Sequence, residues 1–158
     1  MAIASDFQLA GIEIQPAVDL RNVRWRKLMW NIPYNGLSVV LNADTSQIMS
    51  DPASASLAEA LMREVREAAA NCGCAIEESF VDKLLEDTRK MVPYDSSMRL
   101  DFRAARPIEV EAIFGSPLRA ALGAGFNVPR IEMLYHQLVF LDRQNRKAPT
   151  AAHSKPIA

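Results

Sequence analysis

Residues 19 to 41 constrain the fold more than any other part of the chain, because they predict one long helix that is apolar on most of its sides. Asp19 can cap the start of this helix, and Asn42-Ala43-Asp44 ends it. A helix that is apolar on most sides is usually buried among other elements. The sequence therefore predicts a long central helix wrapped by the rest of the chain. Its apolar residues fall at mixed spacings and not along one stripe: Val23, Leu28, Ile32, Leu37, Val39, Val40 and Leu41.

The remaining segments predict further helices and no strand pair. Asp51-Pro52 is a typical helix start, since the carboxylate caps free amides and proline at the first position loses no hydrogen bond. Residues 11 to 15 alternate apolar and polar side chains, which predicts a short half-buried strand. The predicted fold class is therefore all-α with one orphan strand near the N-terminus. Other helices are predicted from about Ile76, from Ser96 or Ser97 to Ala105, from Pro107 and from Pro129.

Composition and charge argue against several classes of protein. A chain of 158 residues, 49% apolar and 23% charged, fits one globular domain. The formal net charge of −1 gives no electrostatic argument for binding nucleic acid or an anionic membrane. No apolar run approaches the roughly 20 residues that span a bilayer, and the N-terminus lacks the pattern of a signal peptide. We therefore expect a cytoplasmic protein with neither nucleic-acid nor membrane partners.

The two cysteines, Cys72 and Cys74, are separated by one residue, so a disulfide between them would be strained. A metal site on this pair would need further soft ligands. The chain offers only His136 and His153, and the second lies in a polar C-terminal segment. We expect packed or exposed free thiols, no bound metal and a reducing compartment.

Gly123-Ala124-Gly125 invites comparison with a dinucleotide-binding loop, but the spacing does not fit. That fingerprint needs a third glycine where this chain has Val128, and it must follow a strand and open a helix. Here the glycines follow a predicted helix and precede Pro129. A helix end followed by a turn is the better interpretation.

One polar stripe crosses the long apolar helix. Lys27, Asn31 and Asn35 are spaced by four, so they share one face of a helix. Pro33 removes its own N–H and is expected to kink the helix between the two asparagines, opening a pocket. A solvated polar strip is the simpler interpretation from spacing alone.

A second polar cluster lies at Tyr94-Asp95-Ser96-Ser97-Met98, and Glu109 follows Ser97 by twelve residues. Serines at a helix start can hold a carboxylate or a hydroxyl group. Glu109 is predicted in the first turn of the helix that Pro107 opens, where the helix dipole favours a carboxylate. Taken alone, both features are explained by helix capping.

Two segments taken together resemble the C-terminal domain of the ketopantoate reductase (2-dehydropantoate 2-reductase) family: WRKLMWNIPYNGLSVVLNA and SSMRLDFRAARPIEVEAIFGSPLRAALGAGFNVPR. The most specific parts are K-x3-N-x3-N, S-M-x2-D and a glutamate twelve residues after the serine. The resemblance runs from about Phe7 to about Asn145, and GIEIQPAVDLRNVRWRKL resembles the junction that precedes the family's helical domain. It implies a multi-helix C-terminal domain of the 6-phosphogluconate-dehydrogenase-like type.

The resemblance also implies a mechanism. The family reduces an α-keto acid by hydride transfer from NADPH, and Lys27 matches the lysine that protonates the developing alkoxide. Asn31 and Asn35 match amides that orient the substrate, and Ser97 matches a residue that binds its polar groups. Glu109 matches a carboxylate that contacts the substrate hydroxyl and balances the lysine, so the two helices must meet across one cleft. Only Lys27 and Glu109 are expected to approach the cofactor.

The chain departs from the family pattern because it lacks the glycine-rich loop of an N-terminal Rossmann domain. Residues 1–18 are expected to be a remnant of that domain or a linker from it, 19–145 the helical substrate-binding domain, and 146–158 a disordered tail. NADP(H) would then bind only to the complete enzyme, and the chain alone should not oxidise NADPH with ketopantoate. Asp101 matches the carboxylate of S-M-x2-D, to which we assign a structural role.

Two alternatives stay open at the level of sequence. Pantoate is the default product, but another small α-keto acid could be the substrate. The chain could also be a free-standing helical module that dimerises or binds a small acid. A homo-oligomer is expected, since apolar surface left where a nucleotide-binding domain would dock favours self-association.

Overall fold

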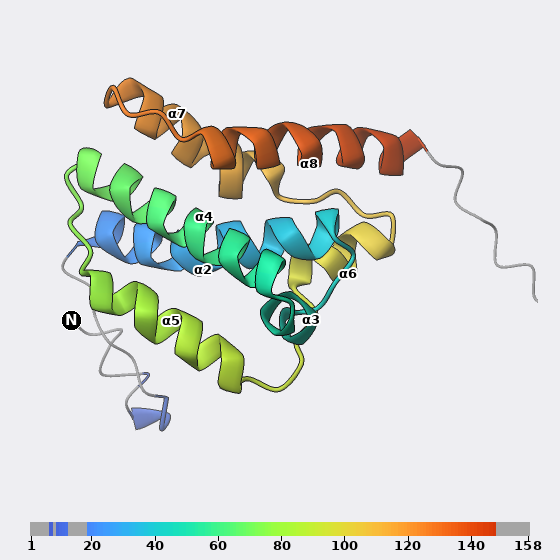
Figure 1. Cartoon of the computed structure of the whole chain (residues 1–158), viewed down its shortest axis with the longest axis horizontal. Helices are drawn as coiled ribbons and strands as arrows, with labels where there is room; N and C mark the ends of the chain where they lie inside the picture. Colours follow the sequence, from blue (N-terminus) through green and yellow to red (C-terminus); the bar gives the residue numbers. More distant parts are fainter. Residues whose placement is uncertain (1–6, 8, 13–18, 148–158) are drawn as a thin grey trace, which may run out of the picture.

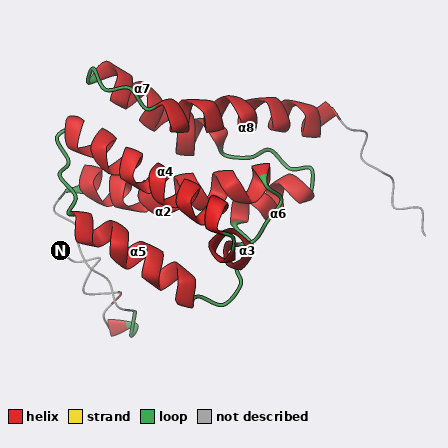
Figure 2. Ribbon diagram, viewed as in Figure 1, coloured by secondary structure: helices red, strands yellow, loops and turns green. Residues whose placement is uncertain are grey.

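The computed structural model describes residues 7, 9–12 and 19–147, and this part of the chain contains helices and no strand (Figures 1 and 2). The predicted all-α fold is confirmed. The strand predicted for residues 11–15 falls mostly outside the described residues, and Gly11, which is described, lies in a turn with φ +73°. None of the described helices is long and apolar enough to cross a membrane.

The long central helix is α2, Leu20–Val40. It begins at Asp19, whose side chain accepts hydrogen bonds from the Arg21 and Asn22 amides at 2.9 and 3.3 Å. Every residue from Ile32 to Val39 is buried, whereas the first turns are mostly exposed. Helices α3, α4, α6, α8 and η1 all contact α2, and α4 does so most extensively. The prediction of a central helix wrapped by the others is confirmed.

A short helix, α3, lies between α2 and the next long helix, α4. Helix α3, Thr45–Ser50, starts with a reciprocal capping box between Asp44 and Gln47. This helix is not predicted from the sequence, because Asn42-Ala43-Asp44 indicates only the end of the preceding helix. Helix α4, Pro52–Asn71, begins as predicted: the Asp51 carboxylate accepts from the Ala53 and Ser54 amides at 3.0 and 2.9 Å.

The second half of the chain forms α5 (Glu78–Lys90), α6 (Ser97–Arg103), the π-helical turn η1 (Glu111–Gly115), α7 (Ser116–Gly123) and α8 (Pro129–Lys147). The helix predicted to open at Pro107 begins only at Val110, and its first full turn is π-helical. Gly123-Ala124-Gly125 closes α7, and Gly125 has φ +77°. The interpretation as a helix end and turn is therefore confirmed. Residues 148–158, where the disordered tail was predicted, lie outside the described residues.

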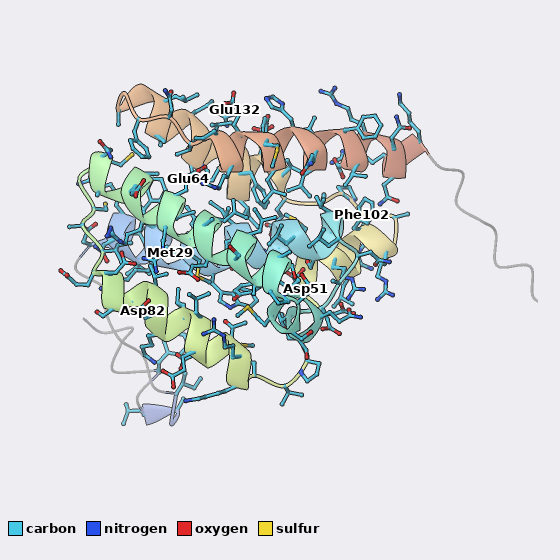
Figure 3. The ribbon with its side chains drawn as sticks, viewed as in Figure 1. Met29, Asp51, Glu64, Asp82, Phe102 and Glu132 are labelled. Atoms are coloured by element: carbon cyan, nitrogen blue, oxygen red, sulfur yellow. The ribbon has the colours of Figure 1, made fainter. Side chains whose placement is uncertain are left out.

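The helices surround a core centred on α2. Figure 1 shows α7 and α8 along one side of the α2–α4 pair, α5 on the opposite side, and α3 and α6 near the C-terminal end of α2. Figure 3 places Met29 in this interior and Glu132 on the outer side of α8. Burial of these apolar side chains is the main favourable contribution to folding. The largest fully buried side chains near α2 are Met29, Ile32, Tyr34 and Phe114.

Candidate functional site

An open pocket of about 230 Å³ lies between the first half of α2 and the start of η1. It brings together Lys27, Asn31 and Glu109, three of the five site residues named from sequence. Asn35 and Ser97 do not line it. Residues 27 and 109 thus meet across one depression, as the family resemblance required. The pocket is lined by Arg24, Lys27, Leu28, Asn31, Glu109, Ala112 and Ile113.

The polar stripe of α2 descends from the surface into the protein. Lys27 is exposed, Asn31 is half-buried and Asn35 is only 4% exposed, although each follows the last by one helical turn. The descent follows from the packing, because α6 reaches the second half of α2 at Ser38 and α8 reaches it at Gly36, and residues 32–39 are all buried there. The stripe is therefore not the solvated strip that spacing alone favoured.

The pocket's charged and amide groups have few protein partners. Within the described part of the chain, neither Lys27 nor Glu109 makes an ion pair, and the side-chain amides of Asn31 and Asn35 make no hydrogen bond. Buried polar groups in proteins are nearly always hydrogen-bonded. Asn35 is buried as a residue, but its side-chain amide is not completely shielded from solvent. These groups are free to bind a ligand.

The two serines near the start of α6 have different roles. Ser96, with no exposed surface, is the helix cap: its Oγ accepts from the Arg99 amide at 3.1 Å and lies 2.6 Å from Ser38 Oγ on α2. Ser38 also donates to the backbone carbonyl of Asn35 at 3.1 Å. Ser97 is the first residue of α6 and its side chain is exposed. The Ser38–Ser96 bond therefore fixes the position of Ser97 relative to the deep end of the stripe.

Glu109 is positioned by backbone contacts of its segment with α8 and with η1. It lies just before the helix, which corrects the prediction that placed it in the first turn after Pro107. The amide of Ile108 donates to Asp142 Oδ1 on α8 at 3.2 Å, and the Ile113 amide donates to the Glu109 carbonyl at 3.1 Å. Asp142 is buried and also pairs with Arg146 at 2.6 Å. No local pattern indicates this contact, because Ile108 and Asp142 lie 34 residues apart in the sequence.

The π-helical turn that follows Glu109 is tied to α8 by a surface network. The Tyr135 hydroxyl donates to Glu111 at 2.6 Å, and Arg119 pairs with the same carboxylate at 3.0 Å. The two bonds lower the pKa of Glu111, and the bond to Glu111 raises the pKa of Tyr135. Gly115 gives the Glu111 carboxylate room, since a Cβ there would collide with it. Such turns are frequent at functional sites, and here the turn adjoins the pocket.

Two further depressions adjoin the Lys27 pocket, and Ala112 lines all three. One, of about 530 Å³, lies between residues 108–112 and the C-terminal half of α8. The other, of about 390 Å³, lies beside the first two turns of α2 and includes Arg21 and Arg24. Sequence reasoning did not single out either arginine. The face of the protein around the start of η1 is thus hollowed over a continuous surface.

Other candidate features are structural in the described residues. No group of three His, Cys, Asp or Glu side chains there could hold a metal ion. Cys72 and Cys74 are free thiols, one partly exposed and one buried, as the sequence predicted. Burial and the neighbouring Cys74 raise the pKa of the Cys72 thiol. Asp101 accepts from Arg106 Nε at 2.7 Å, which ties down the turn after α6.

Comparisons with known proteins agree with this architecture. A family model described as "Ketopantoate reductase PanE/ApbA C terminal" matches residues 19–142. The 2-dehydropantoate 2-reductase of Nostoc sp. is 53% identical over 144 residues, which are 91% of this chain and 45% of that protein. The crystal structure of 2-dehydropantoate 2-reductase from Methylococcus capsulatus matches with a TM-score of 0.87 at 34% identity, covering 93% of this chain and 47% of that one. A dimeric ketopantoate reductase from Staphylococcus aureus shares the fold, with a TM-score of 0.80 at 22% identity, covering 92% and 52%. The chain thus spans about half the length of the relatives it matches.

Proposed function

Because the chain belongs to the ketopantoate reductase family, as its C-terminal domain, we propose that it is the substrate-binding and catalytic-lysine half of an NADPH-dependent 2-dehydropantoate 2-reductase. The observation that carries this proposal is the shared pocket of Lys27, Asn31 and Glu109, whose charged and amide groups have no protein partner in the described part of the chain. An ammonium group, a carboxylate and an amide around one opening suit a small polar substrate with a carbonyl group.

In the proposed mechanism Lys27 acts on the substrate's carbonyl oxygen. Its ammonium group polarises the C=O bond and then donates a proton to the alkoxide oxygen as it forms. Asn31 hydrogen-bonds the substrate beside the carbonyl and fixes its orientation. Glu109 accepts a hydrogen bond from the substrate hydroxyl and offsets the charge of Lys27. Asn35, deeper along the same stripe, and Ser97, at the start of α6, orient the substrate's remaining polar groups.

The hydride comes from NADPH when that cofactor is bound. The described residues contain no strand and no glycine-rich turn that opens a helix, so they lack the backbone cradle that usually holds the pyrophosphate of a dinucleotide. Most of the cofactor would therefore be held by a separate nucleotide-binding domain, with only Lys27 and Glu109 of this chain near its reacting end. We infer that the chain alone does not catalyse the reduction and that this domain is its partner.

The remaining parts of the proposal concern assembly, location and substrate. Exposed large apolar side chains on α8, Met133 at 53% and Phe140 at 61% exposure, favour association with a second copy of the chain. Free thiols suit a reducing compartment, so we propose a cytoplasmic enzyme. Ketopantoate is the default substrate, and another small α-keto acid would fit the same three groups.

A turnover assay tests the proposal. The purified chain, and the chain fused behind the nucleotide-binding domain of the Nostoc relative, are each given NADPH and ketopantoate. We expect no loss of NADPH absorbance with the chain alone and steady turnover with the fusion. Lys27→Ala should reduce turnover of the fusion by about 10²- to 10⁴-fold, the usual contribution of a positioned acid. Lys83→Ala is the matched control, since Lys83 is exposed on α5 and pairs with Asp87 at 2.8 Å.

Turnover by the chain alone, or an active Lys27→Ala fusion, would contradict the mechanism. A binding measurement covers the case in which the fusion does not assemble correctly. Pantoate titrated into the isotope-labelled chain should shift the amide signals of residues 27–31 and 109–113 in the nuclear magnetic resonance spectrum. Loss of these shifts in Asn31→Ala supports the pocket as the substrate site. Pantoate binding by the chain together with an inactive fusion would favour the alternative, a free-standing acid-binding module.

A further inference from the structure

We propose that Arg21 and Arg24 form an anion-binding subsite beside the Lys27 pocket, which holds a carboxylate or phosphate group of a molecule reacting at Lys27. This inference rests on the proposed function, because it takes the Lys27 pocket as the reaction centre. It adds a second recognition point that neither the polar stripe nor the family motifs identify.

The arginine subsite and the Lys27 pocket adjoin each other. The depression of about 390 Å³ beside the first turns of α2 and the pocket at Lys27 share Arg24, Leu28 and Ala112. Arg21 and Arg24 are three residues apart on α2, so their side chains project from the same face. Arg24 stands at the border between the two depressions and can reach into either. A ligand that extends from Lys27 along α2 towards its N-terminus would meet both guanidinium groups.

The charge distribution along α2 supports a ligand and not a structural role. Arg21, Arg24, Arg26 and Lys27 lie within seven residues, and α2 contains no acidic residue. Cations near a helix N-terminus are unfavourable, because that end already carries partial positive charge. The Asp19 carboxylate is engaged in capping the helix through two backbone amides. Within the described first turns of α2, four cations thus lie beside the one carboxylate of the cap, Asp19.

The arginines of the subsite differ from the other arginines of the chain. Arg26 has partners: its Nε donates to Asn22 Oδ1 at 3.0 Å, and its guanidinium lies 4.6 Å from the centre of the Phe80 ring. Most arginines on the other described helices pair with a carboxylate, as Arg66 does with Glu78 at 2.6 Å. In the part of the chain that the structure describes, Arg21 and Arg24 have no acidic partner within 4.0 Å. Their guanidinium groups remain available for an anion.

The chemistry of the depression defines the class of ligand. A guanidinium group binds carboxylate or phosphate through two parallel N–H···O bonds, which an ammonium group cannot do. Trp25, Leu28 and Pro117 supply apolar surface beside the arginines, suited to the carbon skeleton that carries the anion. Two sources share this chemistry: the distal carboxylate of a 2-oxo dicarboxylic acid, and a phosphate of the dinucleotide.

Titrations of the isotope-labelled chain, followed by nuclear magnetic resonance at low ionic strength, test the subsite. Inorganic phosphate should shift the amide signals of residues 21–28 and 112–120. The double variant Arg21→Gln, Arg24→Gln should weaken phosphate binding about tenfold, since charge-assisted hydrogen bonds are lost. The control Arg89→Gln, Lys147→Gln removes the same charge at exposed sites on α5 and α8 and should leave binding unchanged. An equal loss in both double variants would overturn the proposal, because it would show only non-specific attraction.

Three further ligands identify the source of the anion. If the substrate supplies it, 2-oxoglutarate should bind at least about fivefold more tightly than 2-oxobutanoate, and the double variant should abolish that difference. If the cofactor supplies it, NADP⁺ should bind the fusion with the nucleotide-binding domain, and the double variant of that fusion should bind it more weakly. The link to the reaction would be refuted if phosphate binds but neither the preference for 2-oxoglutarate nor the binding of NADP⁺ depends on the two arginines. The variant Lys27→Ala separates the two proposals. If this variant binds 2-oxobutanoate as tightly as the original chain, the proposed function is contradicted. Phosphate binding by the same variant would still support the arginine subsite.

Discussion

Replacing Gly36 with alanine tests how closely α2 packs against α8. Gly36 is buried in the middle of α2. A Cβ at this position would lie 2.5 Å from Leu134 Cδ2 and 3.1 Å from a Phe114 ring carbon. Leu134 is 3% exposed and Phe114 is fully buried, so neither can move without disturbing the core. The position therefore needs a residue without a side chain, and the reason is packing and not backbone conformation.

Two opposing effects set the magnitude. Alanine inside a helix is favoured over glycine by about 1 kcal/mol. Extra volume forced into a packed core costs about 1–3 kcal/mol. Gly36→Ala should therefore lower the free energy of unfolding by about 1 kcal/mol. For a chain of this size, 1 kcal/mol corresponds to a fall of about 2–4 °C in Tm.

Urea unfolding followed by far-ultraviolet circular dichroism measures the change, and Gly123→Ala is the matched control. Gly123 is the last residue of α7, and a Cβ there would have no atom within 4 Å. The same chemical change should then be neutral or stabilising by a few tenths of a kcal/mol. A Gly36→Ala variant as stable as the original chain would refute the reasoning, since it would show that α2 and α8 can separate at no cost.

Two more predictions concern the elements that position the site. Ser96→Ala should lower the free energy of unfolding by about 1–2 kcal/mol in urea unfolding, because it removes the α6 cap and the bond to Ser38; Ser97→Ala, exposed one residue later, should change it little. Tyr135→Phe should remove a pH-dependent part of the stability, measured as thermal unfolding against pH. The folded state lowers the pKa of Glu111 below 4.5, so this contribution is present above pH 4.5 and is lost as the pH falls through the lowered value. The folded state also raises the pKa of Tyr135 above 10.0, so the contribution is lost again as the pH rises through that raised value. A constant difference between Tyr135→Phe and the original chain across the acidic range would contradict the assignment.

Much of the fold could be predicted because its signals are local. The central helix follows from the distribution of apolar residues in α2, and the start of α4 follows from Asp51-Pro52. The end of α7 follows from glycines that can adopt positive φ. The start of the next helix after Pro107 could not be predicted in the same way. This helix begins later than predicted because the amide of Ile108 donates a hydrogen bond to Asp142 on α8. That contact holds the segment before η1 in a non-helical conformation.

The site could be predicted only in part, for a related reason. Helical spacing alone places Lys27 and Asn31 on one face. Whether Glu109 joins them depends on the packing of η1 against α2, which no local pattern encodes. Arg24 was missed because it lies outside the four-residue spacing of the stripe and belongs to none of the family motifs used. Its position at the border of two depressions is visible only once α2 and η1 are packed together.

The descending stripe on α2 explains how one helix can serve both stability and chemistry. Its second half carries Asn35 among fully buried apolar residues, where movement would disturb the core. A polar group held there is fixed in position before any ligand arrives, which is the condition for orienting a substrate precisely enough to react. Its first half leaves Lys27 at the open end, where its side chain is exposed to solvent. If the proposed function is correct, the substrate is anchored from the buried end and protonated from the open end. The hydride must then approach from the hollowed face beside Lys27, Ala112 and Arg24, so a nucleotide-binding domain would have to cover that face and not the outer side of α8.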